Sequence, residues 1–272
     1  MGKRYREKMC AILFIDHLIE EDTRAARIAP LLPRRNHMGR ENNTGSRKSA
    51  AIFPKAAVQF FRELSRNNNK PWMDANRDRY RAEVVAPFRE MLDRLAPAAR
   101  KLNPQFVISG RVNDNFSRIN RDIRFARDKT PYRPQMYLFF AEGGDGVGQL
   151  YLGVGADVVT CGFRIYGGGR AAPLVQFGRV RGRENAKWLA RQKRRLDGEF
   201  DSYWYSTQKG EWTKHNGWPV EADNWKKLQA WIVRRKFSPV AASRSGFQGE
   251  AAKIFKEVYP LMQFACSPKW RA

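Results

Sequence analysis

The spacing of apolar side chains changes once along the chain, and this change constrains the fold more than any other feature. Before Pro104, apolar residues recur every three to four positions, which is the period of an amphipathic helix. After Pro104 they alternate with polar residues, which is the period of a strand with one buried face. The chain therefore combines a helical region with a separate strand region.

Three helices are predicted in the first region. The first ends at the polar run "RNNN", the second has Asn69 as its N-cap with Pro71 in its first turn, and the third starts at Pro87. Proline is tolerated in a first helical turn because its missing N–H would have no intrahelical partner there. The apolar stripes are Phe53, Ala57, Phe60, Phe61 and Leu64 in the first helix, and Phe88, Met91, Leu92, Leu95 and Leu102 in the third.

Five strands are predicted after Pro104, at 105–109, 118–127, 135–142, 149–156 and 158–166. Short spacing and the glycine-rich turn "GGDGVG" indicate an antiparallel meander. From residue 172 onward helical patterns return, including a stripe of Trp225, Leu228, Trp231 and Ile232 capped by Asp223, and a last helix from Phe247 that stops at Pro260. The predicted fold class is α+β, with N-terminal helices, a central antiparallel β-meander and C-terminal helices.

Residues 1–50 differ from the rest of the chain. They end in the polar stretch "RRNHMGRENNTGSRKSA", which is typical of a linker. Two interpretations stay open: a flexible N-terminal arm, or an over-extended start with the true one at Met38. Residues 51–272 are expected to form a single α+β domain.

The cysteine content indicates a cytoplasmic protein, and the charge favours binding of polyanions. Lys and Arg number 51 against 27 Asp and Glu, which gives a net charge of +24. Such an excess favours nucleic acid or other anionic partners, although it can also serve solubility alone. The three cysteines, Cys10, Cys161 and Cys266, are far apart and indicate neither disulfides nor a zinc site. No secretion signal or transmembrane run is recognised, so no membrane association is expected.

Several common chemistries lack their sequence signatures. Neither a phosphate-binding P-loop nor a strand-associated G-x-G-x-x-G occurs, and a G-x-S-x-G elbow is missing as well. The three histidines, His17, His37 and His215, are dispersed, which argues against a histidine metal centre or a Ser-His-Asp triad. No metal and no cofactor are predicted.

The segment "RINRDIRFARDKTPYR", residues 118–133, carries six basic residues and two aspartates. In a strand, Arg118, Asp122 and Arg124 would share one face at spacings of roughly 7 Å. An aspartate between two guanidiniums stays ionised and fixes them, which is how a rigid anion clamp is built. Pro131 then favours a turn that presents Lys129 and Tyr132. The alternative is an ion-pair network with a structural role only.

Two segments resemble a widespread, mostly bacterial family catalogued only as a domain of unknown function. Its members combine the pattern N-N-x-K-x-W-x-x-x-N-R-x-x-Y with R-x-x-R-D-x-R-F-x-x-D-K-x-P-Y-[KR], and the similarity spans about residues 53–265. The resemblance implies no activity, cofactor or substrate, but it suggests that the two segments meet in space. The matching residues are Asn67 or Asn68, Lys70, Trp72, Asn76, Arg77 and Tyr80 in the first pattern, and Arg118, Arg121, Asp122, Arg124, Phe125, Asp128, Lys129, Pro131, Tyr132 and Arg133 in the second.

If the two segments meet, they could form one composite pocket. Aromatic walls would come from Trp72 and Tyr132, and hydrogen bonds from Asn76. The proposed ligand-binding residues are Lys70, Trp72, Asn76, Arg118, Arg121 and Arg124. The proposed acid/base residues are Asp122, Asp128, Lys129 and Tyr132. Each of these side chains has a structural alternative as a core, capping or ion-pair residue.

A second surface is predicted independently at residues 179–236, where basic residues and tryptophans are interleaved. Six of the eight tryptophans lie between 188 and 231. Aromatic and basic side chains together are what a single-stranded nucleic acid needs for stacking and phosphate neutralisation. Trp225 and Trp231 fit a core better, whereas Trp204, Trp212 and Trp218 are the candidates for stacking.

Three functions therefore remain open from the sequence. The first is recognition of a small phosphorylated or nucleotide-like anion at 118–133, with or without catalysis. The second is non-catalytic nucleic-acid binding by the 179–236 surface. The third is a structural scaffold whose motif residues form ion-pair networks. The oligomeric state is not predicted.

Overall fold

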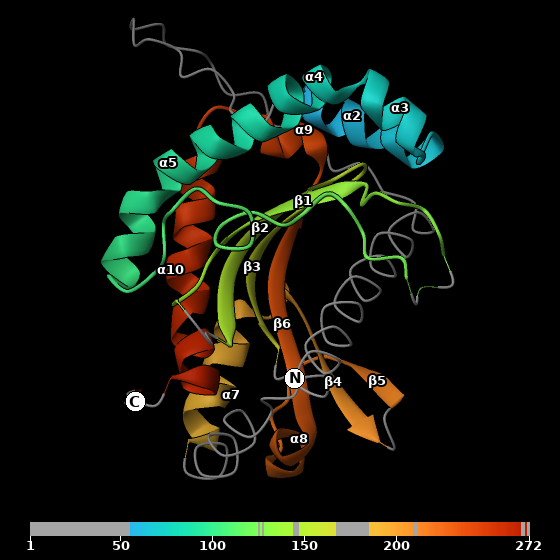
Figure 1. Cartoon of the computed structure of the whole chain (residues 1–272). Coiled ribbons are helices and arrows are strands. Elements are labelled where there is room, and N and C mark those ends of the chain that lie inside the picture. Colours follow the sequence, from blue (N-terminus) through green and yellow to red (C-terminus); the bar gives the residue numbers. More distant parts are fainter. Residues whose placement is uncertain are drawn as a thin grey trace, which may run out of the picture.

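The chain folds as helices packed on a twisted antiparallel sheet, as seen in a computed structural model (Figure 1). The structure describes residues 55–124, 126, 128–143, 147–166, 185–208, 211–267 and 270. The predictions for residues 1–50 and Met38, and for positions 179–184 and 209–210 of the second surface, fall outside these ranges. The α+β class is confirmed.

The N-terminal helices follow the predicted apolar stripes. They are α2 (Lys55–Arg66), α3 (Lys70–Ala75), α4 (Arg77–Arg79), the π-helical η1 (Tyr80–Val85) and α5 (Ala86–Leu102). Asn69 is the N-cap of α3, as predicted, because its Oδ1 accepts from the backbone N–H of Trp72 at 2.9 Å. Pro87 lies in the first turn of α5, also as predicted.

The predicted meander is present as β1 (Gln135–Phe140), β2 (Gly148–Gly155) and β3 (Val159–Tyr166). Each neighbouring pair is antiparallel, with Leu138 opposite Leu152 and Leu152 opposite Cys161. The strand β6 (Leu228–Phe237) pairs with the far edge of β3, and β4 (Asp201–Gln208) and β5 (Glu211–Asn216) complete the sheet. The described strands form one six-stranded sheet in the order β1-β2-β3-β6-β4-β5.

Two predicted strands are wrong. Residues 105–109 contribute only an isolated bridge between Phe106 and Glu142, and residues 118–127 only one between Asn120 and Tyr132. The second segment is instead one arm of a loop, and its backbone carbonyls accept hydrogen bonds from the side chains of Arg133 and Lys129. Pro131 and Pro134 lie in the opposite arm, and proline cannot donate a ladder hydrogen bond.

The C-terminal half contains the predicted helices but also three strands that the sequence patterns did not predict. The described helices here are α7 (Ala186–Leu196), α8 (Ala222–Lys227), α9 (Pro239–Ala242) and α10 (Phe247–Cys266). The predicted helix through Trp225 and Ile232 is wrong after Lys227, where β6 begins. Five consecutive β6 residues, 230–234, are buried, so the strand shows no alternation to distinguish it from a buried helix.

Two helix boundaries also differ from the prediction. The N-cap of α8 is Glu221, whereas Asp223 lies in the first turn and pairs with Lys226 at 2.6 Å. The helix α10 continues through Pro260 instead of stopping there. Its last turns bury Leu261, Met262, Phe264 and Ala265 in the core, and this burial outweighs the hydrogen bond that proline removes.

The sheet has two different faces. Leu138, Leu152 and Phe163 join the main core beneath α10, α5 and α2. The opposite face forms a second cluster in which aromatic rings surround arginines. The Arg164 guanidinium lies 4.9 Å from the ring centre of Tyr137 and 5.2 Å from that of Tyr151. Cation–π contacts and hydrogen bonds thus offset the burial of this charge.

The close pairing of β3 with β6 predicts that Gly162 cannot be replaced by a residue with a side chain. A Cβ at Gly162 would lie 2.0 Å from the Val233 carbonyl oxygen, a backbone atom that cannot move without breaking the ladder. We expect Gly162→Ala to lower the free energy of unfolding by about 2 kcal/mol or more in urea denaturation. The control is Gly249→Ala in α10, where a Cβ meets nothing within 4 Å, so stability should stay unchanged or rise by up to about 1 kcal/mol. Equal losses for the two variants would contradict this packing.

Candidate functional site

The two motif segments meet through Asn68 and Tyr132. The Asn68 Nδ2 donates to the Tyr132 carbonyl at 2.7 Å, and its Oδ1 accepts from the Tyr132 backbone N–H at 3.0 Å. The carboxamide thus pairs with this residue as a neighbouring strand would. Because Tyr132 is only 4% exposed and belongs to the core, the bond fastens the turn between α2 and α3 to the interior.

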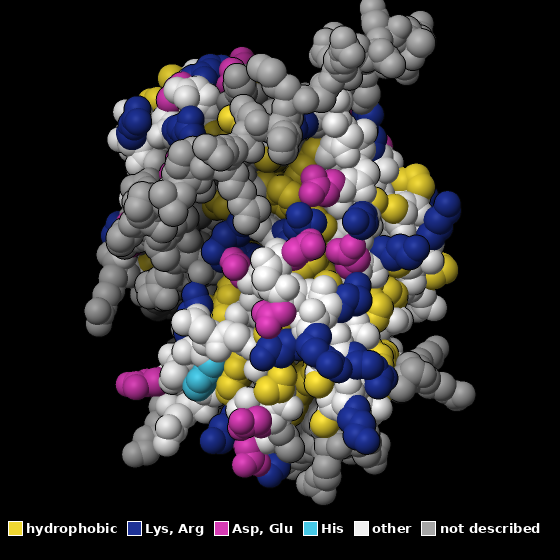
Figure 2. Space-filling view, turned by 180° about the vertical axis from the view of Figure 1, so that it is seen from behind, with side chains coloured by type: hydrophobic (Ala, Val, Ile, Leu, Met, Phe, Trp, Pro, Cys, Tyr) yellow, Lys and Arg dark blue, Asp and Glu magenta, His cyan; other side chains and the backbone are white. Residues whose placement is uncertain are grey.

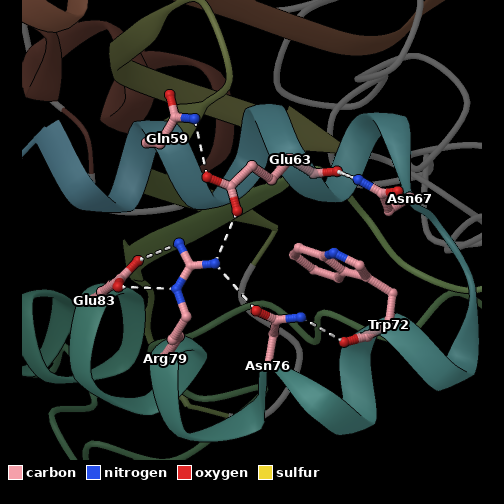
Figure 3. Close-up of polar contacts among 7 residues, drawn as sticks. All are labelled: Gln59, Glu63, Asn67, Trp72, Asn76, Arg79 and Glu83. Carbon is pink, nitrogen blue, oxygen red and sulfur yellow. Dashed lines mark hydrogen bonds and ion pairs between the residues drawn. The ribbon is translucent and has the colours of Figure 1, made fainter.

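An arginine that the sequence interpretation did not select holds the helical segment together (Figure 3). The Arg79 Nη1 donates to Glu63 at 2.8 Å and to Asn76 Oδ1 at 3.0 Å, and its Nε and Nη2 donate to Glu83 at 3.1 and 3.2 Å. Hydrogen bonding by Arg79, and then by Gln59, lowers the pKa of Glu63. One guanidinium therefore ties α2, α4 and η1 together. The i,i+4 spacing of Arg79 and Glu83 is visible in the sequence, whereas the contact with Glu63 is tertiary.

Trp72, Asn76 and Tyr80 lie on the inner side of this helical segment. The Trp72 ring packs 5.4 Å from the ring of Phe60, and the Trp72 carbonyl accepts from Asn76 Nδ2 at 2.9 Å. The Tyr80 hydroxyl lies 3.9 Å from Met136 Sδ, and burial raises the pKa of Tyr80 to about 12. These contacts hold the three side chains against the core, and their assignment to a ligand pocket stays a prediction.

Lys70 is the exposed member of the first motif. Its Nζ lies 2.6 Å from Asp74, a carboxylate that also binds Arg77 at 2.9 Å. The first is a surface i,i+4 pair within α3 and the second a surface i,i+3 pair between α3 and α4. Such exposed pairs contribute only a few tenths of a kcal/mol each.

The described residues between 118 and 133 form a closed loop, named here loop 118–133. Its two arms are joined by backbone hydrogen bonds from Arg121 N–H to the Pro131 carbonyl and from Arg133 N–H to the Ile119 carbonyl, both at 2.8 Å. The Arg133 guanidinium, which is buried, donates to the carbonyls of Arg118 and of Asn120, the latter at 3.1 Å. This side chain replaces the ladder that a strand would have supplied.

Arg121 closes the tip of loop 118–133 from inside. Its side chain is 8% exposed, and its Nη1 donates to Asp128 Oδ2 at 2.9 Å and to both the hydroxyl and the carbonyl of Thr130. Burial alone would raise the pKa of Asp128, but hydrogen bonds from the Thr130 backbone and from Arg121 outweigh it and lower the pKa. Asp128 is therefore ionised at neutral pH as the partner of a buried cation.

The outer rim of loop 118–133 carries charges in fixed positions. Asp122 accepts from Arg124 Nε at 2.9 Å and from Nη2 at 2.6 Å, and this pairing lowers the pKa of Asp122 to about 2. The Arg124 side chain nevertheless remains 58% exposed. The Lys129 Nζ donates to the Ile123 carbonyl at 3.0 Å and lies 3.5 Å from that of Arg124. Arg118 is exposed as well, whereas Phe125 and Arg127 lie outside the described residues.

The predicted stacking tryptophans are mostly buried. Trp204 and Trp218 are 5% and 8% exposed, and Trp204 stacks on His215 with centroids 4.0 Å apart. The rings therefore do not offer free faces for bases. Trp225 and Trp231 are fully buried, which confirms their assignment to the core. Trp212, on β5, is half-buried against Tyr205.

Neither a metal cluster nor a membrane span is found in the part of the chain that the structure describes. Within these residues, no three His, Cys, Asp or Glu side chains are grouped as metal ligands. The helices there are also too short or too polar to cross a bilayer.

The junction of the two motif segments predicts a specific loss of stability. Asn68→Ala removes both hydrogen bonds from the backbone N–H and carbonyl of the buried Tyr132. We therefore expect the free energy of unfolding, measured by urea denaturation, to fall by about 1–3 kcal/mol. The control is Asn67→Ala. The Asn67 side chain, which is exposed, makes one bond to the Glu63 carbonyl at 2.9 Å, so its loss should stay below about 1 kcal/mol. Similar losses would show that the Asn68 bonds do not secure the junction.

Comparison with known proteins identifies the family of the chain. The search of curated proteins found no match. A family model described as "Conserved hypothetical protein (DUF2461)" matches residues 56–264, which include α3 and loop 118–133 as well as β6 and most of α10. Because the match covers most of the 272 residues, the chain belongs to this family of conserved hypothetical proteins.

Proposed function

We propose that the protein recognises an anionic group, such as the phosphate of a nucleotide-like ligand, at the outer rim of loop 118–133. The observation that carries this proposal is the pair formed by Asp122 and Arg124. Two hydrogen bonds hold the guanidinium, yet more than half of the Arg124 side chain is exposed. A fixed, accessible guanidinium binds phosphate with less loss of conformational freedom than a mobile one.

Lys129 supports the same role. Its ammonium contacts the backbone carbonyls of Ile123 and Arg124. The charged groups of Lys129 and Arg124 are therefore both attached to the same short stretch of loop backbone. The buried contacts of Arg121 and Arg133 hold that stretch in shape. In this proposal the buried half of the motif positions the rim, and the rim binds the ligand.

Anion recognition is better supported than a catalytic role in which Asp122 or Asp128 acts as the acid or base. A general acid must carry a proton near the working pH, whereas ion pairing and hydrogen bonding lower the pKa of both carboxyl groups. The Tyr132 side chain belongs to the main core and is only 4% exposed. The structural alternative accounts for Arg121 and Arg133 but gives no reason for the exposed and fixed Arg124.

Asp122→Asn separates a preorganised clamp from simple charge attraction. The substitution raises the net charge by one, so charge alone predicts tighter anion binding. If the carboxylate holds Arg124 for the ligand, binding should weaken instead, by about tenfold. The measurement is isothermal titration calorimetry with ADP at about 0.15 M salt, where surface attraction is screened over roughly 8 Å.

The matched control is Asp78→Asn, which also raises the net charge by one and breaks an exposed pair with Arg81. ADP affinity should change by less than about twofold in this variant. The proposal is rejected if Asp122→Asn binds ADP as tightly as the unchanged protein or more tightly. Loss of stability in Arg124→Gln, without any ADP binding to the unchanged protein, would favour the structural role.

A second candidate function is nucleic-acid binding by α7, which belongs to the predicted basic surface. The helix carries five Lys and Arg and no acid. It is anchored by Leu189 and Leu196 and by Trp188, which stacks on Phe264 at 5.0 Å. Lys and Arg side chains are also spread over much of the surface seen in Figure 2. A cationic helix fixed on one side suits phosphate-backbone contacts without base recognition.

This candidate predicts a change in salt dependence. Replacing the exposed Lys187, Arg191 and Arg194 by Gln should weaken binding of a fluorescein-labelled single-stranded RNA in fluorescence anisotropy. The slope of log K against log salt should fall in magnitude by about 2. The control is the triple Gln variant of Arg66, Arg81 and Arg89, which are also exposed and lie on the N-terminal helices. Equal effects of the two triple variants would mean that net charge, and not α7, governs binding.

A further inference from the structure

A cavity of about 280 Å³ lies where the end of the β1–β2 hairpin meets the last turns of α10. Its walls come from Glu142 and Gly148 at the hairpin and from Tyr259 and Met262 on the helix. No described residue of loop 118–133 lines it, and the rim residues Asp122, Arg124 and Lys129 are not among its walls. Its volume approaches the range of pockets that bind small molecules and suits a ligand with a single ring.

One side of the cavity is apolar and rigid. The rings of Phe106 and Tyr259 meet edge to face at 5.9 Å, and both residues are less than a tenth exposed. Met262 is 4% exposed and adds a polarisable thioether to the same wall. The helix touches β2 here so closely that a Cβ at Gly148 would lie 2.9 Å from Met262 Cγ. These walls fit a flat apolar group.

The other side carries a carboxylate held in place. Glu142 Oε1 accepts from Asn103 Nδ2 at 2.7 Å, which fixes the side chain although the residue is exposed. Glu142 is the single charged side chain among the described residues that line the cavity. The cavity thus has negative character within a strongly basic chain, which carries a net charge of +24.

The Tyr259 hydroxyl adds a second polar group. It accepts from Gln263 Nε2 at 2.9 Å, which leaves its own proton available for donation. Burial, and then the negative charge of Glu142, raises the pKa of Tyr259, so the phenol stays protonated. The cavity therefore offers aromatic surface, one fixed carboxylate and one hydroxyl donor and acceptor.

From this arrangement we propose that the cavity binds a small organic cation, namely a primary ammonium group attached to a ring-sized apolar group. The ammonium donates to Glu142, and the ring packs against Phe106, Tyr259 and Met262. A neutral ligand forfeits the charge-assisted hydrogen bond, and an anion is repelled by the carboxylate. The overall charge of the protein attracts anions instead, so selectivity for a cation can arise only from the cavity itself.

The test compares three probes of nearly the same shape with the full chain: 2-phenylethylamine, 2-phenylethanol and phenylacetate. Ligand-observed NMR titration should give saturable binding of the amine with a Kd of about 1 mM or tighter. The alcohol should bind about tenfold more weakly than the amine, and phenylacetate more weakly still.

Glu142→Gln removes the charge but keeps an oxygen that can accept from Asn103. Amine affinity should fall about tenfold, to the level of the alcohol, whereas alcohol affinity should stay within about twofold. The control is Glu90→Gln on α5, where the carboxylate pairs with Arg94 at 2.7 Å and does not line the cavity. It should leave all three affinities unchanged.

Three results would overturn the proposal. They are the lack of saturable amine binding by the unchanged protein, a phenylacetate affinity equal to that of the amine, and an unchanged amine affinity in Glu142→Gln. Because ADP recognition depends on Arg124 and Asp122, none of these results bears on the proposed function.

Discussion

The pairing of β3 with β6 is the constraint on which the rest of the structure depends. It joins residues 159–166 to residues 228–237 and so unites the β1–β3 meander with the β4–β5 hairpin in one sheet. The two backbones approach so closely at Gly162 that any side chain there would collide with Val233. Closing such a long loop costs entropy, which the aromatic packing of Phe163 and Trp231, 5.1 Å apart across the pair, helps to offset.

The sheet then determines where α10 and loop 118–133 lie. The helix packs on β2 and β3, so its last turns meet the β1–β2 hairpin and enclose the cavity beside Glu142. Loop 118–133 leads into β1, and its last residues are fixed by the bond between Asn68 and Tyr132. Both proposed sites are therefore located at the ends of the meander, where backbone leaves the regular ladder. Functional residues are commonly found on loops that a rigid scaffold positions in this way.

Local patterns predicted the parts of the fold that depend on local spacing. The stripes of α2 and α5, the Asn69 cap and the three hairpin strands follow from periodicity and from cap chemistry. The strand β6 was missed because both of its faces are buried, so its sequence does not alternate. Residues 118–127 were mistaken for a strand because their apolar and charged residues alternate as in a strand, whereas their backbone is held by Arg133.

For the candidate site, the sequence predicts which residue types are present but not which way their side chains point. The prediction placed Asp122 between Arg118 and Arg124 on one strand face, and its pair with Arg124 is present although the segment is a loop. That Arg121 points inward to Asp128 and Arg124 outward depends on the fold of the loop. The bond between Arg79 and Glu63 and the bond between Asn68 and Tyr132 link segments that only tertiary packing brings together. These links decide which motif residues are structural and which remain accessible.

The division of charge between the inside and the outside of loop 118–133 has a physical reason. A buried guanidinium such as that of Arg121 costs several kcal/mol of desolvation, so every neighbouring acceptor is used to offset it. The desolvation cost of Arg124 on the rim is small, because solvent still reaches more than half of its side chain. Its two bonds to Asp122 therefore restrict its motion more than they stabilise the fold. Restricting an exposed cation in this way is of little use to a scaffold, but it favours the capture of an anion.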